Sequence, residues 1–403
     1  MAFSTSISGI DAAQERMSVI SNNIVNAGTV GFKKGSAQFG DLYSSALQDT
    51  GSNAGAGVEL TRIRSDFTQG EFQFTSSPLD LAIDGSGLFL LSGANGTQEF
   101  TRAGSFQSDN QGFIVSESGL RLQGYQSDGN GGLTAALGDL QVDTGLLAQK
   151  QTGQISFSGN IDSRTEIPVN AFNIDDPTSF NSTSTTTIYD SAGRAHELAL
   201  YFAGDPAQAN TFNVYVAIDD VIQPGGVTAL EFDAAGQLTA DSATQLNIAG
   251  YAPDNAAVMD MTVDLAGINN FGSDNTTIDF SQDGYAAGEL LSFAFDDAGT
   301  LISTYTNGQQ RAQGQVALAT FVNPESLQPI GGNGFAQTDE SGVPVIGAPA
   351  SGARGAIRPS ALEMANVDIT SELLALIEAQ RNFQSNAQSI QALNEASTSI
   401  LQL

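Results

Sequence analysis

Residues that could carry out acid–base or metal chemistry are scarce in this chain of 403 residues. His196 is the only histidine and cysteine is absent, so neither a Cys/His nucleophilic site nor a His/Cys zinc site can be built. The sequence from Arg194 to Leu198 places His196 at the start of an alternating strand that follows a turn. We therefore interpret His196 as a histidine on the surface or at a strand end.

The acidic residues give no stronger indication of catalysis. Asp219-Asp220 and Asp296-Asp297 are carboxylate pairs of the kind that glycosidases use, but both lie in turn sequences, and the chain has no Trp for a sugar platform. The stretch from Asp128 to Gly132 resembles the opening of a calcium loop, yet the closing Glu is missing. No P-loop or nucleophile elbow occurs. The sequence predicts no enzyme, no cofactor and no metal site.

A helix is predicted at the C-terminus, because no Gly or Pro occurs from Asp368 to Leu403 and apolar residues follow a seven-residue period. Asp368 is a suitable N-cap, and Glu372 suits the positive end of the helix dipole. Position a of the predicted heptad is occupied by Leu373, Gln380, Ala387, Asn394 and Leu401, and position d by Ile369, Leu376, Phe383, Ile390 and Ser397.

The N-terminus has the same period. Phe3, Ile10, Met17 and Ile24 recur every seven residues, and Asn, Gly and Thr after Ile24 should end this helix. Each helix has a narrow apolar seam that it cannot bury alone, so the two need each other or further copies of the chain. The predicted polymerisation residues are Phe3, Ile10, Met17, Ile20, Ile24, Leu373, Leu376, Gln380, Phe383, Ala387, Ile390 and Leu401.

Between the helices, short apolar runs bounded by Gly, Asn, Asp and Ser predict β structure. An Asp-x-x-Gly sequence recurs at 109–112, 190–193, 233–236, 296–299 and 339–342. Asp can begin a type I turn, and Gly provides the left-handed residue that follows, so these five sequences predict hairpins and antiparallel sheets.

We expect a mixed, mainly β fold in which paired terminal α-helices form a coiled-coil-like inner domain and nested antiparallel β domains are inserted between them. The expected divisions are a terminal helical domain of 1–30 and 366–403, a connecting region of 31–75 and 324–365, an inner β domain of 76–150 and 284–323, and an inserted outer β domain of 151–283.

The composition excludes several function classes. A formal net charge of −30 leaves no basic stripe for a nucleic-acid backbone. No apolar run approaches the ~20 residues that cross a bilayer, so membrane insertion is not expected. The N-terminus lacks the basic and apolar regions of a cleaved signal peptide. The absence of cysteine alone does not decide the compartment.

Short motifs along the chain resemble the bacterial flagellar rod and hook family. They include the stretch from Leu79 to Phe89 and that from Phe100 to Phe106. Val25 stands where the family usually has Ala, and Phe383 where Tyr is common. The terminal motif residues are Asn22, Asn23, Asn26, Gly31, Phe32, Asn366, Asp368, Gln380, Arg381 and Asn386.

A large insert at about 153–283 is similar to the hook members and not to the shorter rod members. The resemblance implies a structural subunit that polymerises with itself into the curved tubular hook, the universal joint that transmits torque from rod to filament. It also implies an extracellular location after export by the flagellar type III apparatus without a cleaved signal peptide. The implied partners are the hook cap protein, the distal rod protein and the hook–filament junction protein.

Other interpretations stay open at this point. A distal-rod or other axial protein would share the terminal motifs, although the insert argues against it. An acidic secreted β-rich binding module would fit the composition but would not need seams at both termini, and calcium should then change its thermal stability. A secreted hydrolase is a third possibility, without the site chemistry that it would require.

Overall fold

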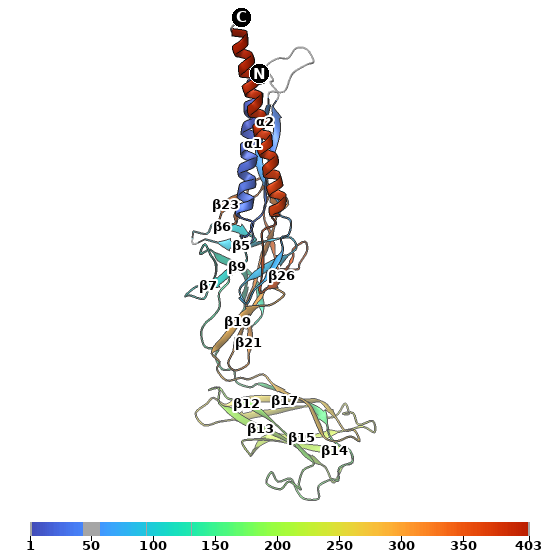
Figure 1. Cartoon of the computed structure of the whole chain (residues 1–403). Helices are drawn as coiled ribbons and strands as arrows, with labels where there is room; N and C mark the ends of the chain where they lie inside the picture. Colours follow the sequence, from blue (N-terminus) through green and yellow to red (C-terminus); the bar gives the residue numbers. More distant parts are fainter. Residues whose placement is uncertain (1, 43–56, 94, 130, 402–403) are drawn as a thin grey trace. The chain divides into compact units, whose positions relative to one another are not determined.

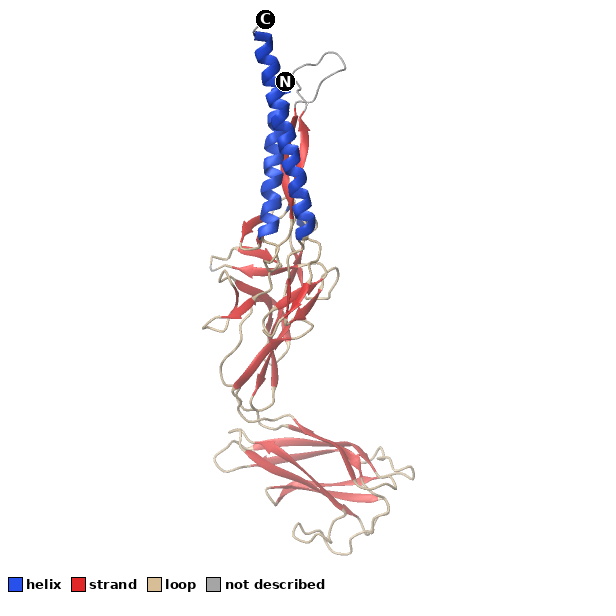
Figure 2. Cartoon of the chain, in the orientation of Figure 1, coloured by secondary structure: helices blue, strands red, loops and turns tan. Residues whose placement is uncertain are grey.

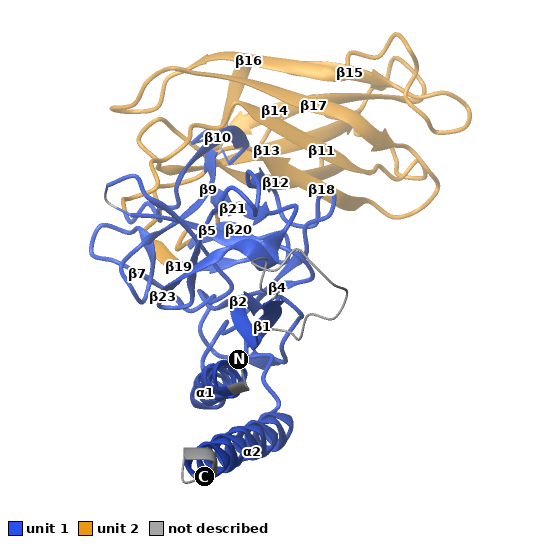
Figure 3. Ribbon diagram, turned by 90° about the horizontal axis from the view of Figure 1, so that it is seen from above, with its two compact units in different colours: residues 1–144, 292–304, 310–403 blue, residues 145–291, 305–309 orange. Residues whose placement is uncertain are grey.

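The computed structural model describes residues 2–42, 57–93, 95–129 and 131–401. It has two compact units (Figure 3): unit 1 comprises Met1–Thr144, Ser292–Thr304 and Gln310–Leu403, and unit 2 comprises Gly145–Leu291 and Tyr305–Gln309. Helices occur at the two ends of the chain and strands fill the middle (Figure 2), which confirms the predicted mainly β fold with terminal helices. None of the described helices is long and apolar enough to cross a bilayer.

The two helices, α1 (Ala2–Val25) and α2 (Ile369–Leu401), begin and end where the sequence indicates. The backbone N–H of Ser371 donates to Asp368 Oδ1 at 2.6 Å, which confirms the predicted N-cap. Hydrogen bonds from this turn, chiefly from the Ser371 backbone, lower the pKa of Asp368. At the other end, the last bond of α1 joins the Asn26 N–H to the Asn22 carbonyl at 3.1 Å.

A hairpin of β1 (Gly35–Leu42) and β2 (Gly57–Ser65) packs along α1, within the stretch predicted to connect the domains. The backbone N–H of Val58 donates to Ser8 Oγ at 3.2 Å. Figure 3 shows α1 lying between this hairpin and α2. Among the described elements, α1 therefore has contacts with both the hairpin and α2, which leaves a third side of α1 exposed.

The remainder of unit 1 is built from strands that pair across the whole sequence. Segments before residue 102 pair antiparallel with segments after residue 317: β3 with β27, β4 with β26, β5 with β22, and β6 with β24. Strands from the C-terminal half of unit 1 are therefore hydrogen-bonded to strands from its N-terminal half. The strand bounds are β3 (Phe72–Phe74), β4 (Leu81–Asp84), β5 (Leu88–Ser92), β6 (Gln98–Thr101), β7 (Phe106–Ser108), β8 (Ile114–Ser116), β9 (Arg121–Ser127), β10 (Leu133–Asp139), β19 (Leu290–Phe295), β20 (Thr300–Tyr305), β21 (Gln310–Val316), β22 (Leu318–Thr320), β23 (Gln328–Gly331), β24 (Gly334–Ala336), β25 (Val345–Gly347), β26 (Ala356–Pro359) and β27 (Ala361–Glu363).

Unit 2 is a sandwich of two four-stranded sheets, in the orders β12-β13-β14-β15 and β16-β17-β11-β18. Alternating apolar residues of both sheets, among them Phe157, Phe202 and Met259, form one buried core between them. The pair β11–β17 is parallel, an exception to the predicted antiparallel pairing. The bounds are β11 (Gln154–Asn160), β12 (Ser182–Tyr189), β13 (Ala195–Gly204), β14 (Thr211–Ile218), β15 (Val221–Glu231), β16 (Gln245–Tyr251), β17 (Met259–Asn269) and β18 (Thr276–Gln282).

All five Asp-x-x-Gly sequences form turns, and their glycines have φ values of 85°, 78°, 75°, 73° and 77° in chain order. In the first, Asp109 Oδ1 accepts the backbone N–H groups of Gln111 and Phe113 at 2.8 and 2.9 Å. The third turn, at 233–236, closes only an isolated antiparallel bridge between Phe232 and Leu238, because the flanking strands β15 and β16 lie in different sheets. The fifth turn, at 339–342, does not form a hairpin, because the flanking strands β24 and β25 pair with β6, β23 and β22 and not with each other.

Candidate functional site

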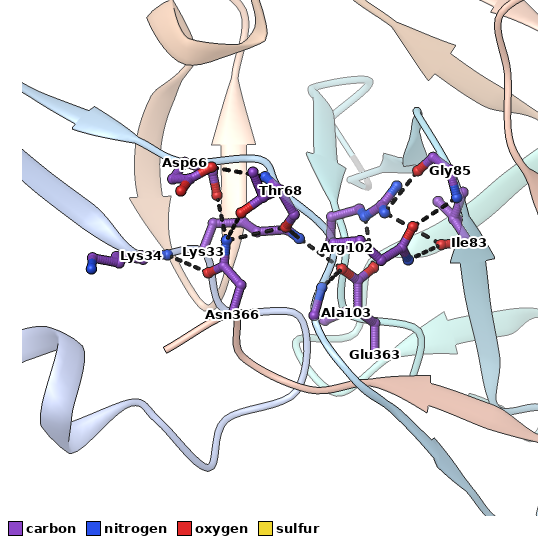
Figure 4. A network of polar contacts seen from close by, with 12 residues as sticks. Lys33, Lys34, Asp66, Thr68, Ile83, Gly85, Arg102, Ala103, Glu363 and Asn366 are labelled. Atoms are coloured by element: carbon purple, nitrogen blue, oxygen red, sulfur yellow. Dashed lines mark hydrogen bonds and ion pairs between the residues drawn. The ribbon is translucent and has the colours of Figure 1, made fainter. Parts of the chain in front are cut away.

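The helices join the β part of unit 1 at a buried charge cluster made by both ends of the chain (Figure 4). The Glu363 carboxylate at the end of β27 accepts hydrogen bonds from Lys33 Nζ at 2.7 Å and from Arg102 Nε at 2.8 Å. The exposed fractions of the three side chains are 0% for Lys33 and Glu363 and 3% for Arg102. Buried ion pairs require close geometry and hydrogen-bond partners for the charged groups, and the two short contacts to Glu363 meet the first requirement.

Two cations share one carboxylate here, and backbone carbonyls accept further hydrogen bonds from both of them. Lys33 Nζ donates to the Thr68 carbonyl at 2.6 Å, while Arg102 Nη1 donates to that of Gly87 at 2.6 Å and Nη2 to that of Gly85 at 2.9 Å. Burial lowers the pKa of Lys33 and of Arg102, and the Glu363 carboxylate acts in the opposite direction on both. The cluster therefore links segments that are far apart in the sequence, and each nitrogen of the two cations donates at least one hydrogen bond.

Gly31 allows the chain to enter this cluster. Its φ is +70°, in the left-handed region, and a Cβ added there would lie 2.3 Å from the backbone nitrogen of Ala103. Its N–H donates to the Glu363 carbonyl at 2.7 Å. A side chain at this position would therefore push the N-terminal segment away from the neighbours of Arg102.

Two asparagines form hydrogen bonds that hold the helix ends against neighbouring segments. Asn366 Oδ1 accepts the Lys34 N–H at 2.8 Å, and its Nδ2 donates to the Asp66 carbonyl at 2.9 Å. Asn23 exchanges two bonds of 2.9 Å with the Gly35 backbone, and its Nδ2 also donates to Glu372 Oε2 at 3.1 Å.

Glu372 has a second partner, Lys34 Nζ, at 2.5 Å. The Glu372 carboxylate, which was expected to interact with the positive end of the helix dipole, is 3% exposed. It links α2 to α1 and to the segment that follows α1.

The helices lie side by side and antiparallel (Figure 1). Asn23 meets Glu372 at the β end, Arg16 Nη2 meets Glu378 Oε2 at 3.5 Å in the middle, and a Cβ on Gly9 would lie 2.8 Å from Asn386 Nδ2. Gly9 thus permits the helices to approach closely at this level.

The predicted polymerisation residues differ in how far their side chains are exposed to solvent. Leu401 is the last residue of α2, and its side chain lies outside the described part. Phe3 and Leu373 are 41% and 46% exposed, and Gln380 is exposed as well. Those that are buried or half-buried are Ile10, Met17, Ile20, Ile24, Leu376, Phe383, Ala387 and Ile390.

Within one chain, the side of α2 that faces α1 is displaced by one residue from one of the two predicted series. Ala379 is 1% exposed and Glu372 3%, whereas Leu373 and Gln380 of the predicted series face solvent. The two series on the inner side of α2 comprise Glu372, Ala379, Asn386 and Leu393, and Leu376, Phe383 and Ile390. The difference arises because Leu373 is the more apolar residue, while Glu372 is buried through its bonds to Asn23 and Lys34.

The residues of the terminal motifs divide between the junction and the helix surfaces. Asn23, Gly31, Asn366 and Asp368 make the bonds described above. Asn22, Asn26 and Phe32 line a cavity of about 460 Å³ beside α1. On α2, Gln380 and Arg381 are exposed, and Asn386 faces Gly9.

The sequence reasoning missed Glu363 as a site residue. The signal that could have indicated it is the presence of Lys33 in a chain with three lysines, since a buried lysine requires an acid.

The residues first considered for chemistry lie in turns and at strand ends. His196 is at the start of β13, as predicted, but its side chain is only 14% exposed, with Nδ1 2.6 Å from Asp219 Oδ2 and Nε2 3.4 Å from Asp190 Oδ2. Asp219 and Asp220 are turn residues with φ of 49° and 63°. Asn130 of the calcium-like stretch lies outside the described residues. Within the described ranges, no group of three His, Cys, Asp or Glu residues could hold a metal ion.

Family models match four segments of the chain. Residues 3–33 match a model described as flagella basal body rod protein, and residues 358–403 match the C-terminal model of the flagellar basal body rod FlgEFG proteins. Residues 82–174 match the D1 domain of the flagellar hook proteins FlgE/F/G, and residues 160–285 match the D2 domain of the flagellar basal body protein FlaE.

Curated relatives match along the whole length. The flagellar hook protein FlgE of Escherichia coli (strain K12) is 36% identical over 416 residues, covering 100% of both chains. That of Rhizobium meliloti (strain 1021) is 34% identical, covering 97% of this chain and 96% of the relative. The crystal structure of Helicobacter pylori flagellar hook protein FlgE2 matches with a TM-score of 0.54 at 14% identity, over 71% of this chain and 99% of that one, and supports the fold.

Proposed function

Because the chain belongs to the flagellar hook protein family, we propose that copies of it assemble through their terminal helices into the curved tubular joint between the flagellar rod and filament. The chain is a structural subunit of the flagellar hook. The proposal also includes that the tube formed by the helices is curved and that it transmits torque from the rod to the filament. It further includes that the chain contacts the hook cap, distal rod and hook–filament junction proteins, and that it is exported through the flagellar type III apparatus.

The observation that carries the proposal is the apolar surface that one chain leaves uncovered on its helices. Ile369, Leu373, Leu374 and Ile377 of α2 are 51%, 46%, 65% and 48% exposed, and Val25 at the end of α1 is 81% exposed. Soluble monomers rarely expose several adjacent apolar residues on one short helical stretch. Packing against the helices of other copies would cover them. The absence of cysteine agrees with a chain that must cross a narrow channel without disulfides.

The experiment is electron microscopy of the purified chain in polymerising salt, beside a variant that lacks residues 1–30 and 366–403. We expect curved tubes from the full chain and monomers from the truncated one. Straight tubes would support a distal-rod protein, which the rod-type models at both termini make the second candidate. A full chain that stays monomeric would contradict the proposal.

A point variant makes the test specific to the helix surface. The double substitution Leu373→Glu and Ile377→Glu should prevent assembly, because it charges the uncovered face without touching the buried side of α2. Ile278→Glu on β18 is a control away from the helices, because Ile278 is 71% exposed and lies in unit 2. Equal loss of assembly in both variants would show that the helices are not the specific contact.

A further inference from the structure

Each terminal helix carries a stripe of exposed residues on the side turned away from the other helix. On α1, Asp11, Glu15, Ser18 and Asn22 are exposed at spacings of four, three and four, which keep them on one face. The inner face of α1 is marked by Gly9, Arg16 and Asn23, which meet α2.

The corresponding stripe on α2 contains Leu374, Ile377 and Arg381, at spacings of three and four. Leu374 is 65% exposed and Ile377 48%. The inner side of the same turns is occupied by Leu376 and Ala379, so this stripe points away from α1.

The two stripes carry opposite charges that form no ion pair with another described residue of the same chain. Arg381 is the only basic residue of α2 and forms no ion pair with any described residue. Asp11 and Glu15 likewise form no ion pair in the described ranges. Arg16 and Glu378, in contrast, are satisfied between the helices of the same chain at 3.5 Å. An unpaired Arg on one face and two unpaired acids on the opposite face are complementary for a second copy.

The axial positions of the stripes also agree. The contacts of Gly9 with Asn386 and of Arg16 with Glu378 fix the antiparallel register of the helices. With the same rise along both helices, Arg381 lies at the level between Asp11 and Glu15. The contact of Asn23 with Glu372 places Leu374 between the levels of Ser18 and Asn22.

An apolar groove lies at that second level. The cavity of about 460 Å³ beside α1 is lined by Ser18 and Asn22, and also by Val19, Phe32 and Ile63. The groove is large enough to hold a leucine side chain, and Val19, Phe32 and Ile63 give it an apolar part. The same face of α1 thus has two acidic side chains, Asp11 and Glu15, that could bind a guanidinium. About seven residues further along, it borders the groove. Leu374 and Arg381 are seven residues apart on α2.

We infer that, in the polymer, the outer face of α2 packs on the outer face of α1 of a second copy at about the same axial level, with Arg381 between Asp11 and Glu15 and Leu374 in the groove beside Ser18 and Asn22. The inference rests on the proposed assembly through the helices. Because two different faces of the chain meet, the contact is head-to-tail, and it continues from copy to copy into a ring or a helical tube.

Charge reversal tests the pairing. Arg381→Glu alone, and Asp11→Lys with Glu15→Lys, should each raise the critical concentration for assembly about tenfold or more, as loss of a close interfacial charge pair does. Combining the three substitutions should restore assembly to within about threefold of the unmodified chain. Arg311→Glu on β21 is the control with the same change in charge, and it should assemble normally.

The outcomes separate this inference from the function on which it rests. If the unmodified chain does not polymerise, the proposed function fails. If it polymerises and Arg381→Glu does so equally well, or if the combined variant stays as poor as its worse parent, only this contact is wrong.

A cysteine pair decides the case in which charge reversal impairs folding. The chain has no cysteine, so Ser18→Cys with Leu374→Cys introduces the only two thiols. Oxidation of assembled polymer should give a ladder of covalent multimers that reduction removes, whereas each single variant should give none. Assembled polymer of the double variant without a ladder would overturn the inference.

Discussion

Glu363 accepts hydrogen bonds from Lys33 and Arg102, which are 330 and 261 residues away in the sequence. The carboxylate also accepts the Gly70 N–H at 2.9 Å, so one side chain joins three segments of unit 1. Its loss would leave two buried cations with only carbonyl partners. The stability of the junction therefore depends more on the anion than on either cation.

Glu363→Ala should lower the free energy of unfolding of unit 1 by about 3–5 kcal/mol, because it leaves Lys33 and Arg102 buried without their counter-charge. Lys33→Met is the matched comparison. It removes a buried ammonium whose pKa is already lowered by burial and keeps the Arg102–Glu363 pair, so its cost should be clearly smaller. Chemical denaturation followed by circular dichroism measures both. An equal or larger loss for Lys33→Met would contradict this account.

The elements of the chain differ in how far the sequence predicted them. The lengths of α1 and α2, the cap at Asp368 and the turn glycines depend on neighbouring residues, and these were predicted correctly. The side of α2 that faces α1 within one chain was not, because it depends on contacts with Asn23 and Lys34, far away in the sequence. Glu363 was missed for the same reason, since nothing near it in the sequence indicates its partners.

Ala379→Asp and Gln380→Asp test the corrected phase of α2. Ala379 is 1% exposed against α1, so a carboxylate there should weaken the pairing of the helices by about 2 kcal/mol or more. Gln380 is exposed, and its substitution should change little. Amide hydrogen exchange along α1 measures the effect. Similar exchange rates in the two variants would indicate that Leu373 and Gln380, and not Ala379, lie on the side of α2 that packs on α1.

At the scale of the whole molecule, the two units have separate cores, and unit 2 contains a carboxylate with a strongly lowered pKa. In unit 2, burial alone would raise the pKa of Asp190, but hydrogen bonds from the Arg194 backbone and guanidinium, from His196 and from the Ala192 N–H outweigh it and lower the pKa to about 2. The stabilisation is therefore complete above the ordinary value of 3.8 and is lost as the pH falls towards about 2.

Unit 2 should consequently lose stability between about pH 4 and pH 2 in thermal melts, as Asp190 takes up a proton on unfolding. The variant Asp190→Asn keeps the side-chain shape but cannot ionise, so it should be less stable at neutral pH and should show a flatter acid dependence. Calorimetry of the full chain measures both. An acid dependence as steep in Asp190→Asn as in the unmodified chain would assign the effect to other groups.

The nested pairing of unit 1 has a consequence for the order in which a newly made chain can fold. Unit 2 is almost continuous in sequence and can close as soon as its own residues are available. Unit 1 pairs β3 to β6 with strands after residue 317, and Lys33 has its carboxylate partner only once Glu363 has emerged. Such distant contacts form late, because a long loop must close first. A chain cut short before β27 would leave Lys33 and Arg102 without their acid, so completion of the C-terminus controls when the N-terminal segment can take its place.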